Sequence, residues 1–155
     1  MRTAALAAVI AFAKTAPGAA VEDYVIVVSP DVPVKSVDLE RVRRLFLFRE
    51  RYWKPGLPVK LLLSESGVEP HSFLLDRVYR MDYSGLRRLI VESLYQEAID
   101  LAPKVVASDE VAVAFVGSGR GLIALVRATA AQGGNAKIVA IDDLLPGASG
   151  YALRR

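Results

Sequence analysis

The chain has 155 residues, of which 53% are hydrophobic and 24% are charged. That length suits one domain with a buried core, and the composition excludes a disordered or fibrous chain. There is no cysteine and one histidine, His71, so disulfides, a cysteine nucleophile and thiolate or His-rich metal centres are excluded. The formal net charge is +3, and outside residues 1–20 the basic residues number 18 against 17 acidic ones. This balance excludes a polybasic nucleic-acid-binding protein.

Residues 1–20 have the pattern of a secretory signal peptide. Arg2 supplies the positive start, residues 4–13 form an apolar run, and residues 17–20 form a small-residue cleavage zone. The apolar run is shorter than the roughly 20 residues that a membrane span needs. We therefore expect an exported, periplasmic protein whose mature domain spans residues 21–155. An uncleaved helix packed on the domain is the alternative.

The first half of the mature chain predicts two strands with a helix between them. Residues 24–28 form a β-branched run that stops at Pro30. Ser36 is predicted to cap a helix whose buried positions recur at helical spacing: Leu39, Val42, Leu45 and Phe46. After a turn at residues 53–56, residues 59–63 are predicted to form a second buried strand.

Two helices are predicted between residues 70 and 103. Pro70 suits the first turn of a helix that continues to Met81. Ser84 is predicted to cap the next helix, and Arg87 and Arg88 are assigned to its solvated face. Pro103 ends this second helix.

The last third of the chain predicts three strands and one helix. The strands are expected at residues 104–107, 122–126 and 137–141, and Ser108 is expected to cap the helix between the first two. The tail from Asp142 is expected to be loose. Alternating strands and helices predict one α/β domain, a three-layer sandwich with a mostly parallel sheet.

Candidate binding residues lie where predicted strands end and helices begin, because α/β domains bind ligands there. Ser64, Ser66 and Gly67 form the best junction, since hydroxyls and free backbone N–H groups can hold an oxyanion. Ser29 and Ser72 lie at comparable positions. The alternative for any such serine, and the favoured one for Ser108, is an ordinary helix cap.

Arg120 lies in a glycine-rich loop between a predicted helix and a predicted strand. It either binds an oxyanion through its guanidinium group or is a solvated residue of a turn. The loop is neither a P-loop nor a dinucleotide fingerprint, because those motifs run from strand to helix. His71 has no evident acidic partner, so no nucleophile–base pair is present. We therefore expect neither an enzyme nor a cofactor.

Taken together, these segments resemble the periplasmic substrate-binding proteins of phosphate ABC transporters. The most specific part is the helix end at residues 45–47 followed by Trp53 and Gly56. The other resembling segments are residues 25–30, 36–40, 57–59, Phe73, 108–116 and 119–123. The resemblance covers roughly residues 25–126.

This resemblance implies about one lobe of a type 2 periplasmic binding-protein fold. Full-length members enclose phosphate between two lobes and present it to a membrane permease. Ser64, Ser66 and Gly67 fall on the family's Ser-Gly loop, although the arginine before that loop is missing and Val68 replaces a threonine.

We therefore expect a solute-binding-like protein that holds a small inorganic oxyanion, phosphate above all, for an ABC-type transport system. Ser64, Ser66 and Gly67 would bind it, with help from Ser29, Ser72 and Arg120. The alternative is an interaction or sensory module of an envelope complex whose ligand site is degenerate.

Overall fold

The computed structural model describes residues 22–155, so the predicted signal peptide lies outside the described residues. The elements in chain order are β1 (Tyr24–Val28), β2 (Ser36–Val37), α1 (Leu39–Phe46), β3 (Tyr52–Lys54), β4 (Leu57–Pro58), β5 (Lys60–Ser64), α2 (Glu69–Leu74), the π-helix η1 (Leu75–Tyr79), α3 (Tyr83–Tyr95), β6 (Lys104–Val106), α4 (Asp109–Ser118), β7 (Leu122–Arg127) and β8 (Lys137–Ile141).

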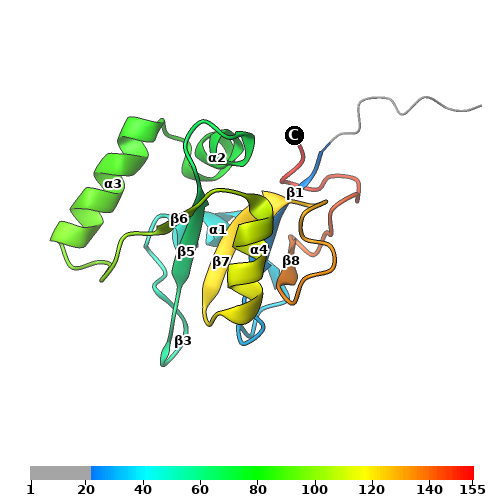
Figure 1. The fold of residues 1–155 in the computed structure, drawn as a ribbon, viewed down its shortest axis with the longest axis horizontal. Coiled ribbons are helices and arrows are strands. Elements are labelled where there is room, and N and C mark those ends of the chain that lie inside the picture. Colours follow the sequence, from blue (N-terminus) through cyan, green and yellow to red (C-terminus); the bar gives the residue numbers. More distant parts are fainter. Residues whose placement is uncertain (1–21) are drawn as a thin grey trace, which may run out of the picture.

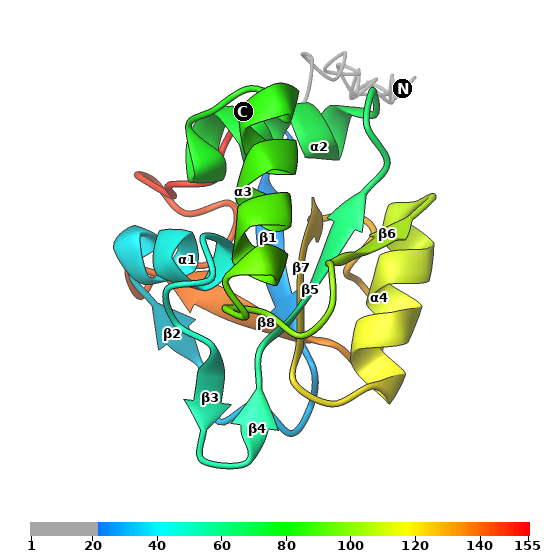
Figure 2. The same cartoon turned by 90° about the vertical axis from the view of Figure 1, so that its left-hand side faces the viewer.

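Six strands form the central sheet, in the order β2-β8-β1-β7-β5-β6. β1 pairs antiparallel with both of its neighbours, and the remaining pairs are parallel. Five strands therefore point one way and β1 points the other way. Figure 2 shows β1 running against β5 and β7. The predicted α/β class with a mostly parallel sheet is confirmed.

Helices cover both faces of the sheet, which gives three layers (Figure 2). The helix α4 packs on one face through Ala112, Val113 and Val116. The helices α1, α2 and η1 pack on the other face. The alternation within β1 explains why its sequence is apolar throughout: Tyr24, Ile26 and Val28 enter one core, whereas Val25 and Val27 enter the other.

The helix caps are partly those expected from the sequence. Ser108 caps α4 by accepting a hydrogen bond from the N–H of Val111, as predicted. The expected caps Ser36 and Ser84 are wrong, because the carboxylates of Asp38 and Asp82 do this at α1 and α3. Asp38 accepts a hydrogen bond from the N–H of Arg41, and Asp82 accepts one from the N–H of Gly85, each three residues later in the chain. This is the geometry of a helix N-cap.

The expectation of a loose tail is also wrong. Tyr151 and Leu153 are 4% and 0% exposed, and they belong to the core on the α1 side of the sheet. The Tyr151 hydroxyl donates to the carbonyl oxygen of Tyr24 at 2.8 Å. Arg154 Nε lies 3.0 Å from Asp23 Oδ1, so the tail is fastened beside the start of β1.

The turn predicted at residues 53–56 joins the two short strands of the β3–β4 hairpin. Trp53 is buried, and its indole N–H donates to the carbonyl oxygen of Gly121 at 2.9 Å. This bond connects the hairpin to the start of β7.

The helix α3 stands away from the sheet (Figure 1). Of its thirteen residues, only Leu86 and Ser93 are buried. Within residues 22–155, no helix is both long and apolar enough to cross a membrane.

Candidate functional site

A hollow of about 320 Å³ lies where β5 ends, between the loop that follows it and the helix α3. Its lining residues are Leu63, Ser64, Glu65, Ser66, His71, Tyr83, Leu86, Arg87, Ile90, Val91 and Val105. The structure therefore places two of the predicted binding serines, Ser64 and Ser66, in one hollow.

The loop after β5 becomes more exposed with distance from the strand. Ser64 is 8% exposed and Ser66 is exposed. Gly67 has φ +89°, and a Cβ atom there would meet nothing within 4 Å. Glycine is therefore favoured by the backbone conformation, and the space beside it is open.

His71 connects α2 to this loop. Its Nδ1 atom lies 2.9 Å from the carbonyl oxygen of Ser64. A carbonyl only accepts hydrogen bonds, so the N–H at Nδ1 is the donor of this bond. Nε2 is buried and has no hydrogen-bond partner among the described residues, and the Tyr83 ring centroid lies 5.9 Å from that of His71.

Arg87 is a lining residue that was not predicted from the sequence to belong to the site. It is exposed, as expected, but it lines the same hollow as Ser64 and Ser66. The available signal was its position four residues after Tyr83, which places both on one helix face. Glu65 also lines the hollow, so the site carries one charge of each sign.

The other four predicted residues, Gly67, Ser72, Ser29 and Arg120, are not among the lining residues of this hollow. Ser72 is exposed on α2 and is not among the lining residues. Ser29 is fully buried, and its hydroxyl accepts the N–H of Leu122 at 3.0 Å.

Ser29 lies at the opposite end of the sheet because β1 runs against β5 and β7. Lys60, at the start of β5, is paired with Leu122, at the start of β7. Ser29 therefore lies near the start of β5, about 13 Å along that strand from Ser64. One small anion cannot contact both serines.

Arg120 also lies at that opposite end. Its Nε is 3.2 Å from Asp31 Oδ2, and its side chain is 81% exposed. Burial alone would raise the pKa of Asp31, but hydrogen bonds from the Gly121 N–H and from Arg120 hold this pKa below its usual value. Arg120 is thus engaged with Asp31, away from the Ser64–Ser66 hollow.

Comparisons with known proteins support the fold. No family model matches the sequence, and no curated protein matches it. The fold matches PstS from Borrelia burgdorferi with a TM-score of 0.67 and 13% identity, over 86% of this chain and 55% of that one. It also matches an ABC-type phosphate transport receptor from Vibrio cholerae, with a TM-score of 0.62 and 14% identity, over 81% and 48% of the two chains.

A third match is a putative phosphate ABC transporter substrate-binding protein with bound phosphate from Clostridium perfringens. Here the TM-score is 0.63 and the identity 12%, over 80% of this chain and 46% of the other. This chain therefore spans about half the length of the solved proteins that it matches. It has the α/β fold of about one lobe of the substrate-binding proteins of phosphate ABC transporters.

Proposed function

We propose that this chain is an exported, non-enzymatic solute-binding-like protein that holds a small oxyanion, phosphate above all, for an ABC-type transport system. The observation that carries this proposal is the hollow at the end of β5. Ser64, Ser66 and Arg87 all line it. Hydroxyl donors beside one cation are the groups that bind a tetrahedral anion.

The binding residues predicted from the sequence do not all belong to this site. Ser64, Ser66 and Gly67 stay in the proposal, and Arg87 joins them. Ser72 remains a secondary contributor on the adjoining helix α2. Ser29 and Arg120 lie at the other end of the sheet, so they take no part in the same contact.

Isothermal titration of the described domain with phosphate, sulfate and molybdate at millimolar concentrations tests the proposal. Phosphate is expected to bind most tightly. R87M is expected to weaken binding about tenfold or more, and S66A about three- to tenfold, since they remove a charged and a neutral hydrogen bond respectively. Arg88 is exposed on the same helix but does not line the hollow, so R88M is the matched control. Absence of heat with all three anions would contradict the proposal.

A second candidate function is an interaction or sensory module of an envelope complex. It is favoured by apolar side chains that α3, the loop after it and β6 leave exposed. Val91 is 58% exposed, Tyr95 90%, Leu101 83% and Val105 57%. Large apolar side chains that a small domain leaves exposed are often part of a protein interaction site.

Crosslinking distinguishes the two candidates. A photoreactive residue at position 95 that captures a permease subunit, together with silent anion titrations, would select the interaction module. The V91D variant should then abolish the crosslink and keep its thermal stability, because Val91 is exposed. Anion binding without any crosslink would select the solute-binding function.

A further inference from the structure

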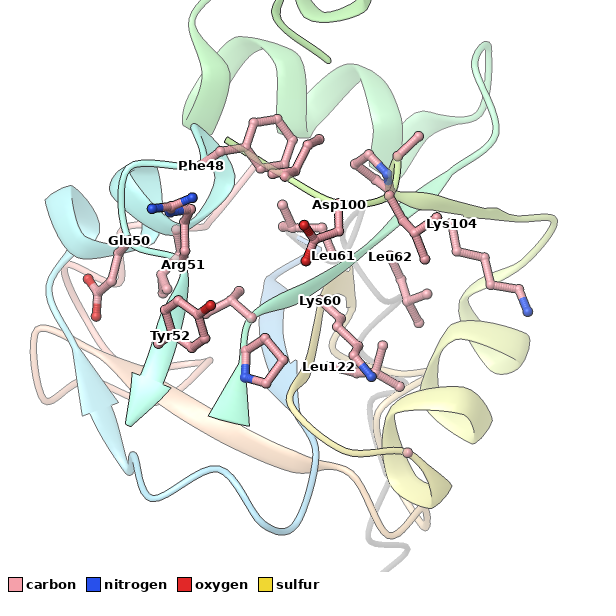
Figure 3. Close-up of a pocket in the computed structure, with 18 of the residues that line it drawn as sticks. Phe48, Glu50, Arg51, Tyr52, Lys60, Leu61, Leu62, Asp100, Lys104 and Leu122 are labelled. Atoms are coloured by element: carbon pink, nitrogen blue, oxygen red, sulfur yellow. The ribbon is translucent and has the colours of Figure 1, made fainter. Parts of the chain in front are cut away.

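A second and larger cavity, of about 500 Å³, shares no lining residue with the Ser64–Ser66 hollow. It lies between the β3–β4 hairpin, the first half of β5 and the segment of residues 98–104 (Figure 3). Its volume is in the range of pockets that hold drug-sized ligands.

The cavity is lined by apolar side chains from both faces of the sheet, Leu45 and Leu61 from one core and Leu62 from the other. Leu61 and Leu62 of β5 are 6% and 2% exposed, and Leu45 of α1 is 1% exposed. Phe48 and Leu122 add further apolar surface. A small inorganic ion gains nothing from such a surface, whereas a hydrocarbon body buries area against it.

Three cationic side chains of the lining, Arg51, Lys60 and Lys104, form no ion pair within residues 22–155. Arg51 donates to the carbonyl oxygen of Ala98 at 3.2 Å. The Lys104 ammonium lies 4.0 Å above the Phe115 ring. Figure 3 shows Arg51 and Lys104 on opposite sides of the cavity.

Two other charged lining residues are already neutralised. Glu50 lies 2.8 Å from Arg41, and Arg120 lies 3.2 Å from Asp31. Asp100 is the remaining carboxylate of the lining, and Figure 3 shows it pointing into the cavity. Among the described residues, the lining therefore carries three cations without an ion-pair partner and one carboxylate, and the cavity favours an anion.

The strand register places two of the cations beside apolar side chains. Lys60 is paired with Leu122, and Leu62 is paired with Lys104. Paired residues share a face of a sheet, as do residues two apart in one strand. Lys60 and Lys104 thus lie on one face, about 8 Å apart at the backbone, and one carboxylate can reach both ammonium groups.

We propose that this cavity binds an amphipathic organic anion, a carboxylate with an apolar chain or ring. The carboxylate lies between Lys60 and Lys104, and the apolar body packs on Leu62 and Leu122. This site is separate from the proposed oxyanion site, and neither depends on the other.

Titration with decanoate tests the proposal, with decyltrimethylammonium as a probe of the same chain and opposite charge. Decanoate is expected to bind saturably at one site, and the cationic probe is not. K60M and K104M should each weaken binding about three- to tenfold, as loss of a partly exposed charge contact does. D100N should tighten binding, because it removes a like charge. K54M is the control, since Lys54 is exposed and does not line the cavity.

A102W separates the cavity from nonspecific binding, because Ala102 is an exposed lining residue outside helices and strands. Its indole should fill the cavity and abolish decanoate binding with an unchanged thermal melt. S66A should leave decanoate binding unchanged, so the two sites fail independently. No saturable decanoate binding, equal binding of both probes, or full binding by A102W would overturn the proposal.

Discussion

The Nδ1 atom of His71 lies 2.9 Å from the carbonyl oxygen of Ser64, and this buried hydrogen bond ties α2 to the end of β5. His71 therefore acts as a positioning residue for the loop that carries Ser66 and Gly67. The H71L variant loses the bond and should be less stable by about 1 kcal/mol.

The H71N variant provides the control for this effect. The side-chain nitrogen of asparagine occupies nearly the place of Nδ1 and can still donate to Ser64. Urea denaturation should therefore show a smaller loss for H71N than for H71L. Equal losses would mean that the ring contributes through packing alone.

The fold could be predicted where the signal is local. Ser108 lies immediately before an apolar helix with acidic residues in its first turn, and it caps α4 as expected. Ser36 and Ser84 carried the same signal, but Asp38 and Asp82 lie close by and cap the helices instead. Two good capping residues within two positions cannot be ranked from sequence pattern alone.

The direction of β1 had no local signal. A strand buried on both faces has the same apolar pattern whether its neighbours are parallel or antiparallel. The antiparallel direction of β1 nevertheless determines which predicted residues can share a site, because it places Ser29 at the end of the sheet opposite Ser64. The pairing of Arg120 with Asp31, 89 residues apart in the chain, likewise depends on the tertiary fold.

Gly121 is predicted to be the least replaceable glycine of the β7 loop. Its φ is +67°, and a Cβ atom would lie 2.3 Å from the carbonyl oxygen of Pro58. The G121A variant should lose about 1–2 kcal/mol through backbone strain and a further 1–3 kcal/mol through overpacking. Thermal denaturation measures the loss.

Gly133 supplies the matched comparison. It has φ +86°, but a Cβ atom there would meet nothing within 4 Å. The G133A variant should therefore show only the strain contribution of about 1–2 kcal/mol. Equal losses of stability in G121A and G133A would show that the close approach of Pro58 to Gly121 does not destabilise the alanine variant further.

Asp23 should make the domain sensitive to acid. The hydrogen bond from Arg154 holds the pKa of Asp23 below 3.8, with help from the Gly147 N–H and against the effect of burial. Its stabilisation is thus present above pH 3.8 and is lost as the pH falls through the lowered pKa. The D23N variant should melt earlier than the wild type at pH 7, and the difference should disappear in strong acid.

Ionisation of Asp109 should have the opposite effect on the stability of the domain. It is 5% exposed, and burial raises its pKa above 3.8 although the Arg127 N–H donates to it at 3.0 Å. Its ionisation therefore destabilises the folded state as the pH rises above 3.8. The D109N variant keeps an acceptor for Arg127 and should melt later than the wild type at pH 7, but not at pH 3.

The matched control for Asp109 is D76N, because Asp76 is exposed on η1. It should change the melting temperature little at either pH. A lower melting temperature for D109N at pH 7 would show that the charge at the start of α4 stabilises the domain.

Because α3 buries only two side chains, its amide protons should exchange with solvent through local opening rather than through unfolding of the whole sheet. This helix also supplies five of the residues around the Ser64–Ser66 hollow. A ligand bound in the hollow would hold α3 in place. Slower deuterium uptake along residues 83–95 would therefore report that the hollow is occupied.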